Sequence, residues 1–568
     1  MKRTVIWVFL LTALLFITTA RPDRVLYVNA SIHTMDAENP VASAFLVEKG
    51  RFRLVGGDEL LSHPATDGAV RVDLNHHSVV PGFIDAHSHF PGSGLRALGP
   101  ELRGQPLGSV NSIEALLSVL ETEHQRLEKG RWLLGFNYDN TVFPNGAHPT
   151  KSQLDSISKT RPIYLWHHSG HMGVANSAAL ASLGYNNSSM PPVGGTLGRD
   201  KQTRELNGLL QERAAPPMRD LLKTAPILDL FEVIEIAAQE YLSVGVTTVQ
   251  DGFSGAAQMR AWRLAQGLNL IPQRLVVWPA HEKWGGSLLE EPIEQISADQ
   301  FSIGPVKLIA DGSPQGLTAY LTQPYHAPLL NQLPRDYRGY PARAFSVLAT
   351  LVEQYHRAGF DLALHGNGDA AIDDILSALE QAQQDYPRAD ARHLVVHAQT
   401  VRQDQLEKMA RLNVSASFFI THTFYFGDWH AKRSLGPERA GNISPTGWAD
   451  AAGLKYSLHS DAPVTPMRPM ELLWSASERL TSSGRLLGSD QRISVARALR
   501  AITIDAAWQS RLEASRGSIE PGKLADFVVL SDDPYTSADV RNIDVLATVI
   551  GGVVRYRQPE AADVKFVQ

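Results

Sequence analysis

The sequence predicts an α/β protein built around a (β/α)8 barrel of the TIM type. Helical and strand patterns alternate through the middle of the 568-residue chain, which predicts βαβ units with parallel strands. Over about 250 residues or more, this alternation favours a barrel over an open sheet, although the pattern alone does not decide between them. Short β-branched runs at 23–80 and 515–560 predict one small sheet domain assembled from both ends of the mature chain.

The first 20 residues have the layout of a secretory signal peptide. Lys2 and Arg3 give a positive start, an apolar run extends from Val5 to Ile17, and residues 18–20 are small enough for cleavage. The run is shorter than the roughly 20 apolar residues of a membrane span. We therefore expect an exported protein of a bacterial periplasm, with an uncleaved membrane anchor as the alternative.

The barrel is expected over residues 81–514, with an insertion at about 100–230. The insertion carries "RPIYLWHHSGHMG" and a patch rich in Gly, Pro and Asn, and we interpret it as a lid on the active-site face. After it, the helical spacing of "FSVLATLVEQYHRAG" ends at Gly359, a residue suited to a C-cap, and the strand "FDLAL" follows. The same order of helix and strand then repeats twice, up to "VSASFFI".

The composition excludes several kinds of partner and site. Hydrophobic residues make up 43% of the chain and charged residues 20%, and the net charge is −6, without a long basic block. Nucleic acid is not an expected partner, because phosphate binding needs clustered Lys and Arg. The chain has no Cys, so it has neither disulfides nor a thiol nucleophile. Metal ligands are thereby limited to His, Asp, Glu and modified Lys.

Polar residues stand where predicted strands end, and such ends converge on the catalytic face of a (β/α)8 barrel. These residues are His87, His89, Lys307, His365, His397 and Asp461. His87 and His89 are two residues apart at a strand end, so both imidazoles point the same way and can reach one ion. By themselves they fit a plain surface pair equally well. The four further residues favour a divalent metal, with zinc expected.

Lys307 lies inside an otherwise apolar strand and has more than one interpretation. It either snorkels out of the strand, pairs with Asp311, or has a neutral amine that reacts with carbon dioxide to form a carbamate. A carbamate is anionic and bidentate, so two metals about 3.5–4 Å apart can share it.

Eight stretches of the chain resemble the amidohydrolase superfamily, in the branch often called amidohydrolase family 3, which includes N-substituted formamide deformylases. The stretches are "PGFIDAHSH", "GVTTVQDG", "VKLIADGSPQG", "LHGNGDAAID", "VVHAQTV", "FFITHTFYFGDWH", "LHSDAPVTP" and "GSIEPGKLADFVVL". They follow the family order across about 23–560 and, as a set, are specific to the family but not to a substrate. The resemblance implies a distorted (β/α)8 barrel with a composite β-sandwich.

The resemblance also implies two metal positions at the strand ends. The first is held by His87, His89 and Asp461, and the second by His365 and His397, with Lys307, if carboxylated, bridging the two. Asp461 is implied as the catalytic base. Whether the site holds one ion or two stays open.

Several other residues have both a functional and a structural interpretation. His171 stands where the family usually has Asp-Gly-His, and it either touches substrate or is structural. His422 either helps to bind a carbonyl oxygen or is a loop histidine. Asp369 is interpreted as a helix cap, with the orientation of a ligand as the alternative. Aromatic residues that either line an apolar pocket or only pack are Trp166, Phe424, Tyr425 and Trp429.

These observations predict an exported metal-dependent hydrolase that acts on non-peptide carbon–nitrogen bonds, in N-acyl, N-formyl or cyclic amides, through metal-activated hydroxide. The same site also suits an esterase, a lactonase or a ring deaminase. A non-catalytic exported binding protein of the same fold is the alternative from another class, because fold does not guarantee function. The expected partners are a small-molecule substrate and, only through an uncleaved signal, a membrane; a homodimer stays open.

Overall fold

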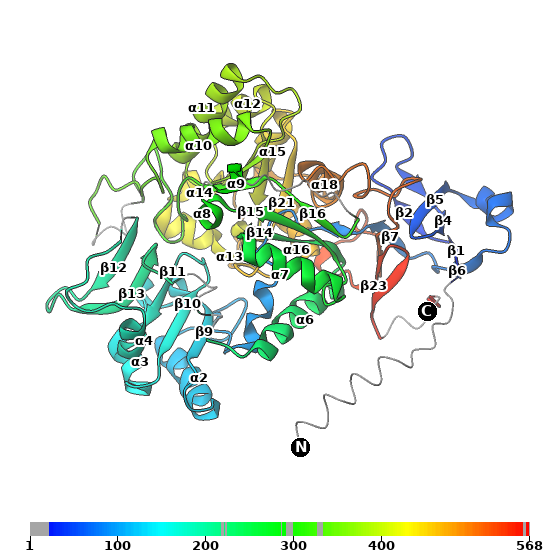
Figure 1. Cartoon of the computed structure of the whole chain (residues 1–568). Coiled ribbons are helices and arrows are strands. Elements are labelled where there is room, and N and C mark those ends of the chain that lie inside the picture. Colours follow the sequence, from blue (N-terminus) through cyan, green and yellow to red (C-terminus); the bar gives the residue numbers. More distant parts are fainter. Residues whose placement is uncertain are drawn as a thin grey trace.

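The computed structural model describes residues 22–192, 194–216, 221, 224–285, 287–290, 299–326, 333–559 and 564–566 (Figure 1). The predicted signal peptide at 1–20 lies outside these ranges. Within them, no helix has the length and apolar character needed to cross a membrane. Figure 1 shows the strand-rich ends of the chain at the right and the insertion at the lower left, with the parallel strands between them.

Two parallel sheets form the centre of the molecule, in the orders β16-β15-β14-β8 and β17-β18-β19-β20-β21. The strands are β8 (Phe83–Ile84), β14 (Val246–Ser254), β15 (Arg274–Pro279), β16 (Phe301–Ile303), β17 (Val306–Ile309), β18 (Leu362–Gly366), β19 (Leu394–His397), β20 (Ser415–Phe419) and β21 (Tyr456–His459). A parallel bridge between Ala280 and Lys307 joins the sheets, and at their other edges the His89 N–H donates to the Ala462 carbonyl at 2.8 Å. The result is a TIM-barrel-like α/β fold.

Helices alternate with these strands along the chain. They are α6 (Ile227–Ser243), α7 (Ala256–Gly267), α8 (His281–Trp284), α9 (Ser287–Glu290), α10 (Phe345–Arg357), α11 (Asp369–Asp385), α12 (Gln403–Arg411), α13 (His422–Trp429), the π-helix η7 (His430–Ser434), α14 (Pro437–Gly441), α15 (Thr446–Ala451), α16 (Pro469–Glu478), η8 (Ser489–Gln491), α17 (Val495–Ala501) and α18 (Ile504–Gln509). In α10, Leu348, Val352 and Tyr355 recur at helical spacing and are buried. The helix stops before Gly359, whose φ of +89° favours a residue without Cβ. The helix and strand order predicted from 345 to 419 is confirmed.

Strands from both ends of the chain share one sheet, in the order β24-β23-β22-β7-β2-β3. A second sheet, β5-β4-β1-β6, comes from the N-terminal part alone. The elements are β1 (Arg24–Val28), β2 (Ser31–His33), β3 (Val41–Ala42), β4 (Ala44–Glu48), β5 (Arg51–Gly56), η1 (Asp58–Ser62), η2 (Pro64–Thr66), β6 (Val70–Asp73), β7 (Ser78–Pro81), β22 (Phe527–Leu530), η9 (Val540–Asn542), β23 (Val545–Ile550) and β24 (Val553–Arg557). The rings of Tyr27 and Phe527, 5.1 Å apart, belong to one buried cluster that both ends build.

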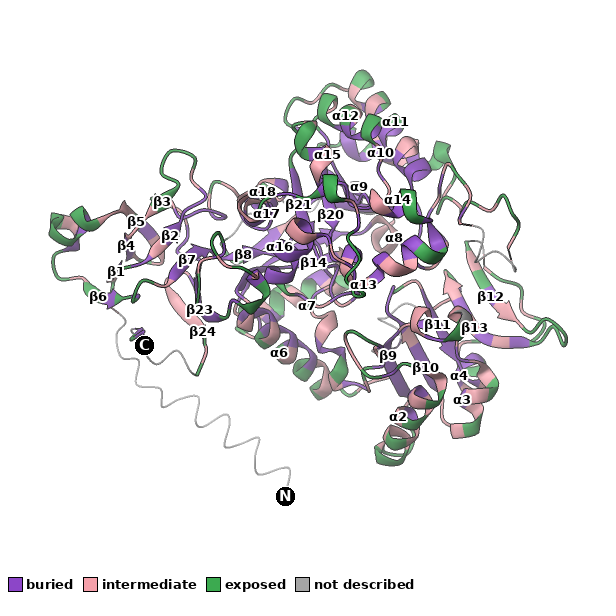
Figure 2. Ribbon diagram, turned by 180° about the vertical axis from the view of Figure 1, so that it is seen from behind, coloured by how far each residue is buried: buried purple, intermediate pink, exposed green. Residues whose placement is uncertain are grey.

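The region of the predicted insertion has a sheet of its own, in the order β12-β13-β11-β10-β9. Its elements, with the turn that leads into it, are η3 (Gly92–Ala97), α2 (Ile113–Arg126), β9 (Leu133–Tyr138), η4 (Asn140–Val142), η5 (Pro144–Gly146), α3 (Lys151–Ile157), β10 (Ile163–His167), β11 (Met172–Ala175), α4 (Ser177–Ser182), β12 (Gly195–Arg199) and β13 (Leu206–Glu212). Strands β9 and β10 are parallel, so the residues that follow them meet at one edge. Figure 2 shows that the central strands are largely buried.

The prediction that Asp369 caps a helix is wrong. The N-cap of α11 is Gly368, and Asp369 is the first residue of the helix. The Asp369 carboxylate instead accepts the backbone N–H of Thr322 at 2.9 Å and pairs with Arg402 at 3.3 Å. It therefore fastens the segment that follows β17 to the starts of α11 and α12.

A buried ion pair connects the parallel strands to the strand-rich ends. Arg274 of β15 is 2% exposed, and its Nη2 donates to Asp526 Oδ1 at 2.7 Å. Asp526→Ala removes the carboxylate that is paired with this buried guanidinium. We therefore expect chemical denaturation to show a free energy of unfolding about 3–5 kcal/mol lower. Arg126→Ala, which breaks an ion pair whose Arg126 side chain is 77% exposed, should cost less than about 1 kcal/mol. Equal losses in the two variants would contradict the argument from burial.

Candidate active site

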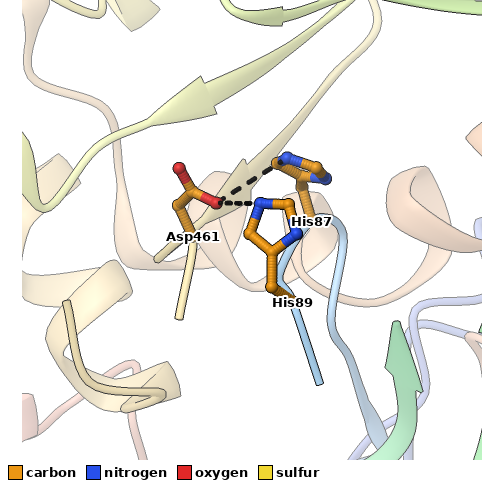
Figure 3. A group of neighbouring side chains, drawn as sticks. All are labelled: His87, His89 and Asp461. Carbon is orange, nitrogen blue, oxygen red and sulfur yellow. Dashed lines mark ion pairs between the residues drawn. The ribbon is translucent and has the colours of Figure 1, made fainter. Parts of the chain in front are cut away.

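Three side chains from two strand ends meet in one group (Figure 3). His87 and His89 follow β8, and Asp461 follows β21. Asp461 Oδ1 lies 3.7 Å from His87 Nε2 and 3.3 Å from His89 Nε2. His87 and Asp461 are buried, whereas His89 is partly exposed. Within the described ranges, this is one of two groups of His and acidic side chains whose ligand atoms lie close enough together to hold a metal ion.

The surroundings of the Asp461 carboxylate indicate whether a cation fits between these three side chains. Its Oδ1 is buried and makes no hydrogen bond of normal geometry with the described residues. Burial alone would raise the pKa of Asp461, but the adjacent His89 imidazole lowers it, so the carboxylate is anionic. A buried anionic oxygen without a donor is unfavourable, and a cation placed between it and two imidazole nitrogens removes that penalty. Two nitrogens and one carboxylate oxygen are a donor set that zinc accepts.

The backbone is left-handed at two of the site residues. Asp461 has a φ of +52° and His397 a φ of +74°. Such values are uncommon for residues with a Cβ and cost on the order of 1–3 kcal/mol each; they collect at functional sites. Packing and hydrogen bonding around the strand ends therefore hold a conformation that these residues do not prefer.

Gln250 of β14 fixes the orientation of His87. Its Oε1 accepts a hydrogen bond from His87 Nδ1–H at 3.0 Å, and its Nε2 donates to the Ala86 carbonyl at 3.0 Å. With the proton on Nδ1, His87 Nε2 keeps its lone pair on the side of Asp461. A hydrogen bond to the other ring nitrogen is usual for metal-binding histidines. Burial lowers the pKa of His87, which keeps the imidazole neutral, as a metal ligand must be.

Lys307 of β17 points into the same group. Its Nζ lies 3.2 Å from His87 Nε2 and 5.6 Å from the centre of the Trp278 ring. The residue is buried, so the snorkelling interpretation is wrong. Burial lowers the pKa of the amine to about 7. The neutral form, which is the form that reacts with carbon dioxide, is therefore accessible near neutral pH.

Asp311 has partners other than Lys307. Its carboxylate accepts the backbone N–H groups of Tyr320, Asn367 and Gly368 at 3.0, 3.0 and 2.8 Å. These bonds tie the end of β17 to the end of β18. Asp311 thus holds the backbone of the site together, and the predicted pairing with Lys307 is replaced by this role.

His365 and His397 form a second pair of facing imidazoles. His365 Nδ1 and His397 Nε2 are 3.1 Å apart, and burial lowers the pKa of both rings. His397 Nδ1 lies 3.1 Å from His459 Nε2, and His459 Nδ1 lies 2.8 Å from Ser417 Oγ. With Nδ1–H donated to His459, His397 Nε2 keeps its lone pair toward His365. This tautomer suits a cation shared by the two rings.

His171 reaches the site from the insertion. Its ring centre is 5.7 Å from that of His365, and its Nδ1 lies 2.9 Å from Glu212 Oε2. Burial opposes the charged form, but the Glu212 carboxylate outweighs it and raises the pKa of His171. Glu212 ends β13, and its backbone N–H donates to the His171 carbonyl at 2.7 Å. The insertion therefore supplies an imidazole–carboxylate pair beside the strand ends.

The remaining predicted residues have packing contacts. His422 is buried between Gln315 and His430, with Nε2 and Nδ1 each 3.3 Å from a nitrogen of these neighbours. The ring centres of Phe424 and Trp474 are 5.3 Å apart, and those of Trp166 and Tyr164 are 6.2 Å apart. The Tyr425 hydroxyl donates a hydrogen bond to the Glu471 carboxylate at 2.8 Å. Their roles toward a substrate stay predictions.

Sequence reasoning did not identify Gln250, His459 and Glu212. Gln250 lies in the stretch "GVTTVQDG", and a buried amide inside a β-branched strand is a signal that could have singled it out. His459 is a histidine two residues before Asp461, a spacing that places both on one side of a strand. Glu212 had no such signal, because only folding of the insertion brings it to His171.

A TIM-barrel-like α/β fold with a His and Asp metal group at its strand ends is typical of metal-dependent hydrolases. The chain belongs to the amidohydrolase family, whose sequence profile matches residues 71–556. It is therefore an enzyme that hydrolyses amide-type bonds.

Two relatives cover most of the chain. An N-substituted formamide deformylase of Arthrobacter pascens is 28% identical over 548 residues, which are 94% of this chain and 98% of that protein. Protein LONG AFTER FAR-RED 3 of Arabidopsis thaliana is 30% identical over 547 residues, 94% of this chain and 91% of that protein. The crystal structure of an uncharacterized metal-dependent hydrolase from Pyrococcus horikoshii shares the fold. Its TM-score is 0.72 at 24% identity, covering 91% of this chain and 99% of that one.

Gln250→Leu should weaken metal binding about 10- to 100-fold, because the hydrogen bond that holds the His87 tautomer is lost. The measurement is a zinc titration in competition with a chelating dye. Gln250→Glu is the matched control, since it keeps an acceptor for His87 Nδ1–H while also losing the bond to Ala86. Equal affinities of the Leu and Glu variants would contradict the proposed role.

Proposed function

We propose that this enzyme hydrolyses carbon–nitrogen bonds other than peptide bonds, in small N-formyl, N-acyl or cyclic amides, with zinc as its metal. The observation that carries the proposal is the buried Asp461 Oδ1, which has no normal hydrogen bond to the described residues and faces His87 Nε2 and His89 Nε2. The relative described as an N-substituted formamide deformylase makes N-formyl amines the first substrates to test.

Six side chains hold the metal in this proposal. His87, His89 and Asp461 would hold one ion, His365 and His397 would hold a second, and Lys307, if carboxylated at Nζ, would supply a ligand to both. The buried amine with a pKa near 7, 3.2 Å from His87 Nε2, supports the bridge. When bound, the metal polarises a substrate carbonyl and lowers the pKa of water.

Asp461 moves the proton. The attacking water forms a bond to the carbonyl carbon and gives a proton to the Asp461 carboxylate, whose lowered pKa keeps it ready as a base. The carbon–nitrogen bond then breaks, and Asp461 delivers that proton to the leaving nitrogen. The products are a carboxylic acid and an amine. His171, oriented by Glu212, contacts the substrate from the insertion, and His422 assists at the carbonyl oxygen.

We also infer that the two parallel sheets make one distorted (β/α)8 barrel and that the strand-rich ends make one composite β-sandwich. The bridge between Ala280 and Lys307 and the hydrogen bond from His89 to Ala462 support the closed barrel. The buried cluster shared by Tyr27 and Phe527 supports the sandwich. Export to a periplasm rests on the N-terminal sequence, and a secretion assay of the full chain tests it.

The first experiment is metal stoichiometry by elemental analysis, on the mature protein and on Lys307→Ala, both with bicarbonate. We expect about two metals in the parent, a sharp fall in the variant, and a loss of turnover of more than about 100-fold. One metal retained in both would overturn the bridging role. A parent that takes up no metal, with zinc or manganese supplied, would overturn the metal site.

A substrate panel separates the competing functions. It contains N-formyl amines, N-acyl amines, cyclic amides, esters, lactones and aminated rings. Preferential turnover of amides supports the proposal, and turnover of esters or lactones alone would replace it by an esterase. A fully metallated protein that binds members of the panel without converting any would favour the binding-protein alternative.

Glu212→Gln should lower kcat/KM for the best amide about 10- to 100-fold, while metal content stays at the parent level. The variant keeps the shape of the side chain but removes the charge that holds His171. Glu205→Gln, in the same strand-rich insertion with a side chain 57% exposed, is the control and should change nothing. Parent-level kcat/KM in Glu212→Gln would assign His171 to a structural role.

A further inference from the structure

A second group of metal-ligand side chains lies in the insertion, away from the barrel strand ends. Asp139 directly follows β9, His167 is the last residue of β10, and His168 comes next. One ligand atom from each residue lies within 4.8 Å of the others. The backbone N–H of His168 donates a hydrogen bond to the Tyr138 carbonyl at 3.1 Å, which holds the ends of β9 and β10 together. Figure 1 shows β9 and β10 side by side. Because the two strands are parallel, the polar residues at their carboxyl ends lie close together, as they do at the central strands.

His168 has an unused nitrogen that points into this group. The residue is 4% exposed, and its Nε2 is buried without a hydrogen-bond partner among the described residues. Asp139 Oδ1 lies 3.5 Å away, too far for a good hydrogen bond. A buried imidazole nitrogen rarely stays without a partner, so this atom indicates a missing ligand. Its ring stacks on Phe426 of α13, with centres 4.9 Å apart, and so cannot turn away freely.

His167 is oriented by hydrogen bonds on both of its nitrogens. Nδ1 lies 2.8 Å from Ser169 Oγ, and Nε2 lies 2.9 Å from Asn140 Oδ1. The Ser169 backbone N–H also donates to Nδ1 at 3.2 Å, so Nδ1 is an acceptor and Nε2–H donates to the Asn140 amide oxygen. Both nitrogens of His167 therefore have partners in the protein. Loss of the Nε2 proton would make this nitrogen a metal ligand without moving the ring atoms.

We propose that Asp139, His167 and His168 form a second metal site, for a zinc-class divalent cation. Two imidazole nitrogens and one carboxylate oxygen favour zinc or cobalt over calcium or magnesium, which prefer oxygen ligands. The Asn140 amide oxygen is in place as a fourth donor. Arg103, whose positive charge acts on His168, is paired with Glu101 at 2.7 Å, so its charge is compensated.

The position of the site gives it a structural role. It joins the ends of β9 and β10. Because the His168 ring stacks on Phe426, it also holds the insertion in contact with α13. Phe426 also contacts His422, with ring centres 5.0 Å apart. A metal here fixes the insertion over the barrel and does not take part in the reaction.

The test counts metals in a protein whose barrel site is disabled. His87→Ala/His365→Ala removes a ligand from each proposed metal position of the active site. In this background we expect one zinc per chain by elemental analysis, and one equivalent of cobalt with the visible absorption of a four-coordinate site. Adding Asp139→Asn or His168→Gln should remove that equivalent, and adding His124→Gln, a histidine of α2 in the same insertion, should leave it.

Three outcomes overturn the proposal. They are a background variant that binds no zinc or cobalt, an equivalent that survives both Asp139→Asn and His168→Gln, and binding only at millimolar metal. Thermal unfolding of each variant checks that it is folded. The result is independent of the proposed activity, because the amide hydrolase can be correct with this second site absent.

Discussion

The Asp461 carboxylate is anionic and buried, and its Oδ1 makes no normal hydrogen bond with the described residues. A charge in that position is tolerable only with a counter-charge, and His87 and His89 present their Nε2 atoms to the same oxygen. The surroundings follow from this arrangement. Gln250 holds the tautomer of His87, and His459 does the same for His397, so that lone pairs and not protons face the centre. The left-handed backbone conformation of His397 and Asp461 is unfavourable for residues with a Cβ, and the packing of the surrounding parallel strands maintains it.

Burial has a second effect on the chemistry of the centre. It lowers the pKa of His87, His365 and His397, which keeps these rings neutral, and it lowers the pKa of Lys307 to about 7, so that these groups can act as ligands or as a reactive amine. The pKa values of Asp461 and Lys307 are both lowered, but by different causes. The adjacent His89 imidazole lowers the pKa of the Asp461 carboxylate against the effect of burial, whereas burial itself lowers the pKa of the Lys307 amine. At one pH the Asp461 carboxylate can therefore act as a base while the nearby Lys307 amine is neutral and nucleophilic.

The insertion contributes to the site and does more than cover it. Its sheet places Glu212 so that His171 is held beside His365. The same sheet gathers Asp139, His167 and His168 at the ends of two parallel strands, next to α13. Glu212 and His171 meet across the antiparallel pair β11 and β13. Asp139, His167 and His168 instead follow parallel strands, as the residues of the central site do, and side chains that follow neighbouring parallel strands lie close together. The substrate class is accordingly expected to depend on this region, where the chain departs from the central alternation of strand and helix.

The sequence by itself determined the alternation of helices and strands, the family, and the six strand-end residues His87, His89, Lys307, His365, His397 and Asp461. These are local patterns: spacing along one strand or helix, and motifs of a few residues. The tertiary structure decided which partners each residue has. Asp369 binds Thr322 and Arg402 in place of capping its helix, and Asp311 binds backbone N–H groups in place of Lys307. It also decided that Glu212 reaches His171, 41 residues away along the chain. The reason is physical, since hydrogen bonds and pKa values depend on burial and on neighbours that only the folded chain brings together.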